Sequence, residues 1–327
     1  MAELTDNKHK KFIFVIGPTA VGKSQWALEQ AIRYQGSIIN IDSVQLYQGL
    51  EIGSAAPTQA EKKMVPHYLY SYVEAPHEMT AGVYLRDFYN LINSENLRGP
   101  VFIVGGTGFY IQALEKGMYD LAPGNAKVRK QIEEDLKTNG ADSFFTELSA
   151  ADPLHEIHIN DHYRLARAIE ILRTSGETPT QLKAKAILHN ANAFPYPYLK
   201  LGFTDSKEAL LPRVQKRTRF ILDSGILDET KSFLDRGFAN WSPLASVGYK
   251  EVANYLIHNN STSAGRQSLF ESIVTSTMQL IKKQKTWFQR DQATLWFETS
   301  ANDQLEAAAR LDLYLTSVDQ NVTAKGY

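Results

Sequence analysis

The chain has 327 residues, of which 43% are hydrophobic, and its 35 lysines and arginines nearly balance its 36 aspartates and glutamates. This composition is that of a folded protein, and the near-neutral charge neither indicates nor excludes a polyanionic partner. The absence of cysteine excludes disulfide frameworks and thiolate zinc sites. No apolar run approaches the roughly 20 residues that a membrane span needs, and residues 1–11 are polar, so we expect a cytoplasmic protein without membrane association.

A phosphate-binding motif stands near the start of the chain. Residues 12–16 are a short apolar run of strand type, and the sequence that follows fits G-x-x-x-x-G-K-[ST] with Gly17, Gly22, Lys23 and Ser24 at the fixed positions. The glycines let backbone N–H groups approach an anion, the lysine brings a cation, and the serine hydroxyl is suited to Mg²⁺. The motif predicts a diphosphate-binding loop; a glycine turn with a solvated lysine is the alternative. It does not name the reaction, because kinases, hydrolases and transferases all use such loops.

A second apolar strand, expected over residues 37–41, ends at Asp42. This strand, loop, helix and strand series predicts a parallel sheet, whose ligands lie beyond the carboxyl ends of the strands. Asp42 is therefore expected to face the phosphate site. Three roles stay open for it: a catalytic base, a cap for the turn at Ser43, or a Mg²⁺ ligand acting through water.

Residues 51–77 are predicted to be irregular, and a helix is expected over residues 81–93. A buried strand over residues 101–104 leads into GGTGFY. The glycines of this segment would let the chain turn tightly and place the Thr107 hydroxyl in the same cleft, although glycines after a strand are often ordinary turn residues.

The character of the sequence changes after residue 117. Helices are predicted over residues 126–139 and 161–174, no strand-like run interrupts residues 126–185, and strand character returns at residues 199–203. We therefore predict an α/β domain of residues 1–117 and 199–327 that carries an all-helical insertion of residues 118–198. Inserted helical domains near a phosphate site often act as lids or clamps.

Basic side chains on three predicted helices are candidates for contact with a nucleic acid. Arg129, Arg164 and Arg167 of the insertion could meet a phosphate backbone, and a solvated helix face explains them equally. On the later helix of residues 269–288, Lys282 and Lys283 belong to a polar stripe that could neutralise the phosphates of a nucleic acid. The alternative is an amphipathic helix whose lysine-rich face is exposed to solvent. Arg217, on a helix expected over residues 207–224, lies at the border of the apolar side and can reach into a cleft.

Six segments together resemble the tRNA dimethylallyltransferase family over about residues 11–297: GPTAVGKS, DSVQLY, GGTGFY, NDHYRLARAIEIL, SVGYKE and QLIKKQKTWF. The resemblance implies a P-loop NTPase-like α/β core with a helical insertion that grips the tRNA anticodon stem-loop. It implies transfer of a dimethylallyl group from dimethylallyl diphosphate to N6 of the adenosine next to the anticodon, with Mg²⁺, by a protein expected to be a monomer. One rival is a P-loop small-molecule or nucleotide kinase, which would consume ATP with a small acceptor. The other is a non-catalytic RNA-binding protein, and the intact Lys23, Ser24 and Asp42 argue against this second rival.

The resemblance also implies roles for individual residues. Thr19 would lie near the oxygen of the transferred group, Ser24 would hold Mg²⁺, and Asp42 would be the base for the adenine amine. The implied diphosphate site is Gly17, Pro18, Thr19, Ala20, Val21, Gly22, Lys23 and Ser24, and the implied catalytic residues are Asp42, Lys23, Thr19, Thr107 and Arg217. The implied tRNA contacts are Asp42, Ser43, Val44, Gln45, Thr107, Arg129, Tyr163, Arg164, Leu165, Ala166, Arg167, Ser246, Val247, Gly248, Tyr249, Lys250, Lys282 and Lys283. They also extend to Glu251 and to the rest of the helical stretch of residues 277–284.

The sequence departs from the family pattern at four of these positions or beside them. His162 and Tyr163 replace a usual proline and glutamine, Ser246 replaces a frequent cysteine, and Met278 replaces a common arginine. Tyr163 could stack on a base instead of hydrogen-bonding to it. The loss of a cation at Met278 is expected to weaken affinity for tRNA.

Overall fold

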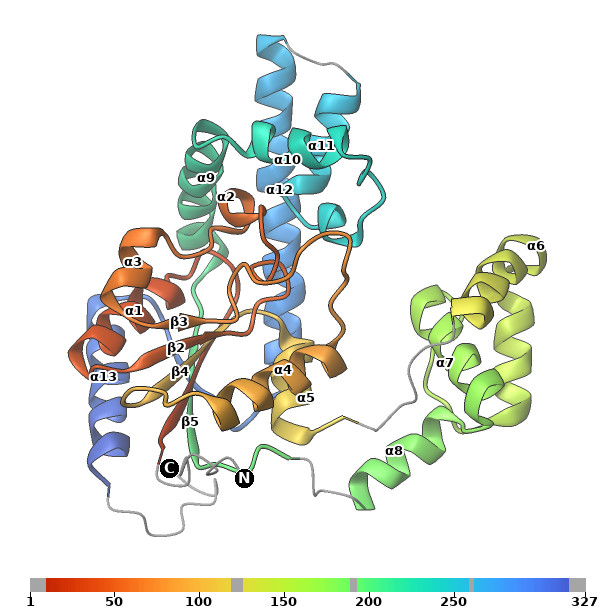
Figure 1. The fold of residues 1–327 in the computed structure, drawn as a ribbon, viewed down its shortest axis with the longest axis horizontal. Coiled ribbons are helices and arrows are strands. Elements are labelled where there is room, and N and C mark those ends of the chain that lie inside the picture. Colours follow the sequence, from red (N-terminus) through yellow and green to blue (C-terminus); the bar gives the residue numbers. More distant parts are fainter. Residues whose placement is uncertain (1–9, 119–125, 189–192, 259–261, 318–327) are drawn as a thin grey trace. The chain divides into compact units, whose positions relative to one another are not determined.

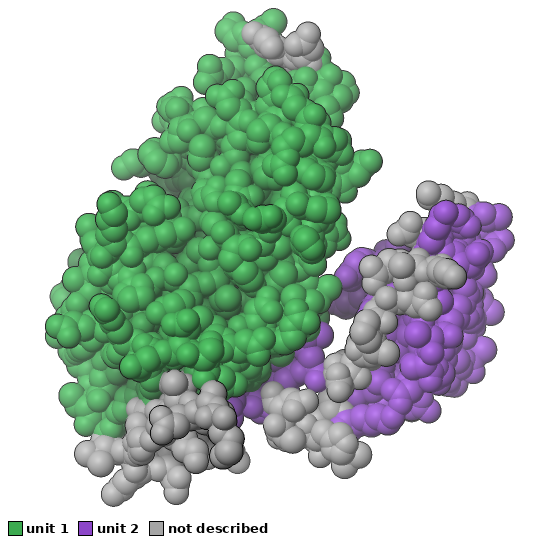
Figure 2. All heavy atoms as spheres, in the orientation of Figure 1, with its two compact units in different colours: residues 1–112, 196–327 green, residues 113–195 purple. Residues whose placement is uncertain are grey.

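The computed structural model describes residues 10–118, 126–188, 193–258 and 262–317. The chain forms two compact units, coloured separately in Figure 2. The first combines residues 1–112 with residues 196–327, and the second comprises residues 113–195. The predicted insertion, residues 118–198, falls mostly in the second unit.

A parallel sheet forms the centre of the first unit (Figure 1), and its strand order within the described residues is β3-β2-β4-β1-β5-β6. Every pairing is parallel, which confirms the predicted α/β fold. Strands buried on both faces are continuous apolar runs, and β1, with the sequence FIFVI, is wholly buried. The strands are β1 (Phe12–Ile16), β2 (Ser37–Asn40), β3 (His67–Tyr68), β4 (Val101–Gly105), β5 (Tyr198–Phe203) and β6 (Leu295–Phe297).

Helices cover both faces of this sheet. On one face, Ile13 and Val15 of β1 share a buried cluster with side chains of α1, α9, α12 and α13. On the other, the Tyr84 hydroxyl of α4 donates to the Asn40 carbonyl at 2.6 Å, and the Tyr84 ring stacks on Tyr110 of α5. The helices of this unit are α1 (Lys23–Arg33), α2 (Glu51–Ser54), α3 (Gln59–Met64), α4 (Ala81–Ser94), the first part of α5 (Gly108–Lys116), α9 (Lys207–Asp223), α10 (Ile226–Asp235), the 3₁₀ helix η3 (Ser242–Ala245), α11 (Tyr249–Ile257), α12 (Ser263–Phe288) and α13 (Ala301–Thr316).

The expectation that residues 51–77 are irregular was wrong. The segment contains α2, α3 and β3. Thr58 begins α3 with a capping box, in which its hydroxyl accepts from the Glu61 N–H while the Glu61 carboxylate accepts from the Thr58 N–H. These elements span only two to six residues each, so they show no periodicity that a sequence pattern could reveal.

The second unit is helical in its described part, with α6 (Ala126–Ala151), α7 (His162–Ser175) and α8 (Pro179–Leu188). The predicted helix end at Gly140 appears as a break inside α6, where φ is 73° and ψ is 176°. Apolar side chains of α6 and α7, among them Phe144 and Ile169, form a separate buried core. Arg173 binds both Asp135 and Glu147, at 2.8 and 2.6 Å, and ties α7 to both halves of α6.

No helix within the described ranges combines the length and the apolar character that crossing a bilayer requires.

Close packing of α12 on α5 can be tested at one glycine. A Cβ on Gly108 would lie 2.2 Å from Cδ1 of Trp287, so Gly108→Ala should lower the free energy of unfolding by about 1–3 kcal/mol. Gly82→Ala, in the first turn of α4, is the matched control because the nearest atom to its Cβ is 4.0 Å away. It should stabilise the protein by up to about 1 kcal/mol. Urea denaturation measures both values, and a shift of the same sign in the two variants would contradict this account.

Candidate active site

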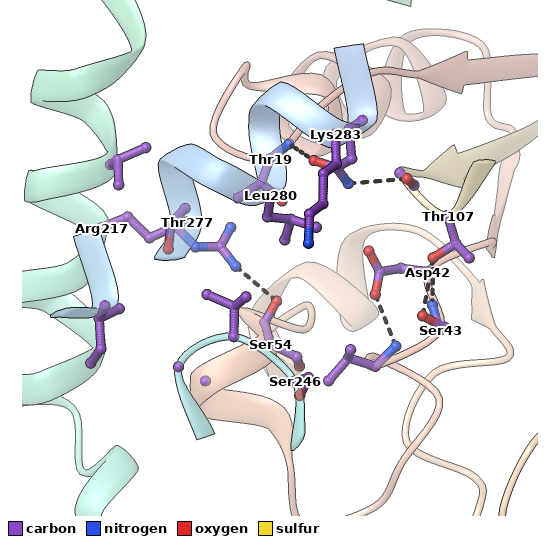
Figure 3. Close-up of a pocket in the computed structure, with 18 of the residues that line it drawn as sticks. Thr19, Asp42, Ser43, Ser54, Thr107, Arg217, Ser246, Thr277, Leu280 and Lys283 are labelled. Carbon is purple, nitrogen blue, oxygen red and sulfur yellow. Dashed lines mark hydrogen bonds between the residues drawn. The ribbon is translucent and has the colours of Figure 1, made fainter. Parts of the chain in front are cut away.

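A cavity of about 470 Å³ opens beyond the carboxyl ends of the strands, within the first unit (Figure 3). It lies there because β1, β4 and β2 end level with one another: Ile16 pairs with Gly105, and Asn40 with Val104. Its polar lining includes Thr19, Asp42, Thr107, Arg217, Lys283 and Gln284, and its apolar lining includes Phe109, Val214, Ile221, Ile273, Leu280 and Trp287.

The predicted phosphate loop joins β1 to α1 in a conformation suited to an anion. Gly17 has φ of 146° and its Cβ would lie 2.2 Å from the Phe203 carbonyl oxygen, so only glycine fits beside β5. Ala20 and Gly22 have φ of 67° and 88°. No side chain caps the N-terminus of α1 at Gly22, so the first N–H groups of the helix remain available to an anion.

Lys23 and Arg217 place two cationic groups near Asp42. Burial lowers the pKa of Lys23 to about 8; the Asp42 carboxylate opposes this shift and the Arg217 guanidinium adds to it. Burial also lowers the pKa of Arg217, again opposed by Asp42. Lys23 Nζ donates to the Pro18 carbonyl at 3.2 Å, and Arg217 donates to the Ser54 carbonyl at 3.1 Å. Two desolvated cations close together favour an anionic ligand.

Asp42 both caps a turn and faces the cavity. Its Oδ1 accepts from the Val44 N–H at 3.0 Å, which confirms the capping role, and the other carboxylate oxygen points into the cavity (Figure 3). The buried Asn40 fixes the start of this turn, since its Oδ1 accepts from the Asp42 N–H at 2.9 Å while its Nδ2 donates to the Leu69 carbonyl. Asn40 was not singled out from the sequence, because a polar residue that ends a strand gives no sign of its partners.

Thr107 ties the loop after β4 to the Asp42 turn. Its hydroxyl accepts from the Ser43 N–H at 2.9 Å and donates to the Ser43 hydroxyl at 3.2 Å. The side chain of Gln45, another expected contact, donates instead to the Ser54 and Ala55 carbonyls.

The expected reason for the glycines of GGTG was wrong. None of Gly105, Gly106 and Gly108 has a positive φ, so no tight turn requires them. Each instead admits a neighbour: a Cβ would lie 2.5 Å from the Ile41 carbonyl at Gly105, 2.8 Å from the Gln284 amide at Gly106, and against the Trp287 indole at Gly108.

Gln284 of α12 reaches the phosphate loop, which the sequence did not indicate. Its Oε1 accepts from the Thr19 N–H at 2.9 Å, and its Nε2 donates to the Gly106 carbonyl at 3.0 Å (Figure 3). The helical spacing of Leu280, Gln284 and Trp287, which all line the cavity, was the available signal.

Glu229 of α10 is a second residue that the sequence did not indicate. Its carboxylate accepts from the N–H groups of Ile52 and Gly53 and from the Tyr249 hydroxyl, at 2.9, 3.0 and 2.5 Å. Burial raises the pKa of Glu229, and these hydrogen bonds oppose the shift. The carboxylate thereby holds α2, whose Ser54 carbonyl receives Arg217.

The remaining expected tRNA contacts of the first unit divide into three groups. Ser246, Val247 and Gly248 line the cavity, and Lys283 points into it from α12 (Figure 3). Lys250 and Lys282 are exposed. Tyr249 was expected at an RNA surface, but its ring is fully buried because it packs against Gly53 and binds Glu229.

The expected contacts of the second unit lie at or near the start of α7, except for Arg129 in α6, whose side chain is outside the described part of the structure. Tyr163 is 84% exposed, and Arg164 is exposed beside Asp161. Arg167 pairs with Glu170 at 2.5 Å, and Ala166 packs against the core of this unit. Leu165 belongs to that core and is fully buried, so its side chain supports α7 instead of presenting a contact.

Comparison with known proteins places the chain among tRNA-modifying transferases. A family model described as IPP transferase matches residues 45–291, more than half of the chain. The tRNA dimethylallyltransferase of Bdellovibrio bacteriovorus is 46% identical over 289 residues, which are 88% of this chain and 92% of that protein. The enzyme of the same name from Geobacter metallireducens is 35% identical over 302 residues, covering 90% and 94%.

Solved structures give the same result. A tRNA isopentenylpyrophosphate transferase of Bacillus halodurans has a TM-score of 0.65 at 26% identity and covers 94% of this chain and 97% of its own. A eukaryotic dimethylallyltransferase acting on tRNA has a TM-score of 0.74 at 23% identity, covering 93% and 78%, which shows a shared fold. The resemblance inferred from the motifs is therefore confirmed, and the chain belongs to the IPP transferase family, that of the tRNA dimethylallyltransferases.

Proposed function

We propose that this protein transfers a dimethylallyl group from dimethylallyl diphosphate to N6 of the adenosine next to the anticodon of tRNA, releasing diphosphate. The observation that carries the proposal is the convergence of Thr19 of the phosphate loop, Arg217 and Asp42 on one cavity, with Lys23 beside them. The names of the relatives support the same reaction. The kinase alternative is not favoured, since these relatives are named for dimethylallyl transfer to tRNA.

The cationic side of the cavity suits the leaving group. The allylic carbon separates from diphosphate with cation-like character, so negative charge builds on the diphosphate oxygens. The loop N–H groups, Lys23 and Arg217 would stabilise that charge. The Thr19 side chain, which lines the cavity, would lie near the oxygen that joins the allylic carbon to the diphosphate and leaves with it.

The reaction must also remove a proton from the adenine amine, and we assign this step to Asp42. An exocyclic amine conjugated into adenine is a weak nucleophile, and a carboxylate that accepts its proton as the new bond forms accelerates the reaction by about 10² to 10⁴. The oxygen of Asp42 that does not cap the turn is the one that would accept this proton. The apolar wall of Ile273, Leu280 and Trp287 would exclude water from the allylic cation.

Magnesium fits this site as a companion of the donor. The Ser24 hydroxyl lies exposed in the first turn of α1, and within the described ranges no cluster of three or more His, Cys, Asp or Glu could hold a metal by itself. Mg²⁺ commonly keeps several waters and binds through substrate phosphates, so one hydroxyl beside a diphosphate is a sufficient protein contribution. When bound, the ion would neutralise charge on the leaving diphosphate.

Contacts with tRNA are proposed for both units. In the second unit, which we propose as the grip on the anticodon stem-loop, the exposed Tyr163 and Arg164 offer a stacking ring and a cation. In the first unit, the backbone at Gly248 and the lysines at positions 250, 282 and 283 are the candidates. We expect the protein to act as a monomer, as the sequence resemblance implied.

Incubation of the protein with unmodified tRNA, Mg²⁺ and dimethylallyl diphosphate tests the proposal directly. Mass spectrometry of the digested nucleosides should show an adenosine that is heavier by one dimethylallyl group, and sequencing of the tRNA should place it beside the anticodon. ATP in place of the donor should give no product. Consumption of ATP with a small acceptor, and no modified nucleoside, would favour a kinase.

Asp42→Asn should lower the single-turnover rate of transfer by about 10² to 10⁴, because an amide cannot accept the proton. The substitution retains an oxygen that accepts from the Val44 N–H, so the turn should persist and the affinity for an anticodon hairpin should change less than threefold. Asp223→Asn, at the exposed end of α9, is the matched control. An unchanged single-turnover rate in Asp42→Asn would refute the role of base.

Lys23 predicts a pH dependence of donor binding. In the free protein its pKa is about 8, and a bound diphosphate raises this pKa, so binding above pH 8 takes up one proton. Affinity for a non-reactive dimethylallyl diphosphate analogue should be flat between pH 7 and 8 and fall about tenfold per pH unit above it. Calorimetry in buffers of different ionisation enthalpy measures the proton uptake. Lys23→Gln should bind weakly at every pH without uptake; uptake that persists in this variant would assign the proton to another group.

A further inference from the structure

The Gln284 side chain joins the two glycine-rich loops that border the cavity. Its amide has both polar atoms engaged, Oε1 with the Thr19 N–H at 2.9 Å and Nε2 with the Gly106 carbonyl at 3.0 Å. These partners lie 265 and 178 residues away in the sequence. Because both polar atoms of the amide are hydrogen-bonded, the Gln284 side chain has a fixed orientation. Lys282, two residues earlier on α12, is exposed.

Gly106 provides the space for this amide. A Cβ there would lie 2.8 Å from Nε2 of Gln284, 3.0 Å from the Gly17 carbonyl oxygen and 3.7 Å from Nζ of Lys23. The loop after β4, the phosphate loop and α12 therefore meet within van der Waals distance of one position. Any larger residue at Gly106 would displace the glutamine amide or the phosphate loop.

The occupied Thr19 N–H matters for the donor. In a phosphate loop the backbone N–H groups are the anion ligands, and here one of them is already satisfied by the Gln284 oxygen. That bond holds the Thr19 peptide in one orientation, with its side chain at the cavity, and sets the direction of the loop that follows. A loop held in its binding conformation binds without the entropy loss of ordering.

We propose that Gln284 is a positioning residue for the diphosphate donor: it clamps the Thr19 peptide of the phosphate loop to Gly106 and so preforms the donor site. The resemblance implied that the same residue contacts tRNA. The two roles predict different effects of its substitution: one weakens binding of the donor, and the other weakens binding of tRNA. The inference rests on the proposed function for the identity of the donor, but the clamp itself is defined by the two hydrogen bonds.

The test compares Gln284→Met, which keeps the length of the side chain and removes both hydrogen bonds, with Gln267→Met, an exposed position on the same helix. Gln284→Met should raise the KM for dimethylallyl diphosphate about tenfold, as expected for two lost hydrogen bonds, and change the KM for tRNA less than twofold. Gln267→Met should change neither. A raised KM for tRNA with an unchanged KM for the donor would overturn the proposal, as would no change in either.

Two further measurements keep the result interpretable. Direct binding of a non-reactive donor analogue, with tRNA omitted, should show the same tenfold loss in Gln284→Met, so the clamp is tested even if the wild-type protein fails to modify tRNA. In that case the analogue still reports on the clamp while the missing product counts against the proposed function. If Gln284→Met does not fold, Gln284→Asn, whose amide is one methylene shorter and cannot reach both loops, should show the same donor-specific defect; a normal donor affinity in Gln284→Asn would overturn the proposal.

Discussion

The level ends of three parallel strands are the constraint on which the rest of this site depends. Because β1, β4 and β2 are in register, the backbones that leave Ile16, Gly105 and Asn40 emerge side by side. Side chains at these exits would keep the loops apart: a Cβ on Gly105 would lie 2.5 Å from the Ile41 carbonyl, and one on Gly17 would lie 2.2 Å from the Phe203 carbonyl oxygen. The glycines therefore permit the close approach that brings the phosphate loop, the Asp42 turn and Thr107 to one cavity.

The same close approach places more positive than negative charge at the phosphate loop. Burial lowers the pKa of both Lys23 and Arg217, and the Arg217 guanidinium lowers that of Lys23 further. Asp42 opposes these shifts with a single negative charge. Asp42 already uses one oxygen to accept from the Val44 N–H. An anion with two or more charges is therefore favoured at the phosphate loop, because it neutralises the cations.

Local sequence patterns predicted the parts of the molecule that local forces determine. The phosphate loop, the long helices and the buried strands carry their own signals in glycine spacing and apolar periodicity, and the family membership that these motifs indicated is confirmed. Asn40 and Glu229 gave no such signal, and the helical spacing of Gln284 did not reveal its partners, since all three act through residues that lie far away in the sequence or that side-chain type does not identify. The same reason explains why the glycines of GGTG were assigned to a turn: their necessity lies in α12 and β2, which no local window includes.

Helix α12 directs neighbouring side chains to different surroundings. Turned toward the sheet, Gln284 and Trp287 pack into the spaces left by Gly106 and Gly108 and fix the loops that border the cavity. Turned away, Lys282 is exposed to whatever approaches from solvent. Lys283 lies between these directions and points into the cavity. Adjacent residues on a helix point about 100° apart, and that rotation alone separates a lysine for the surface, a lysine for the cavity and a glutamine for the loop.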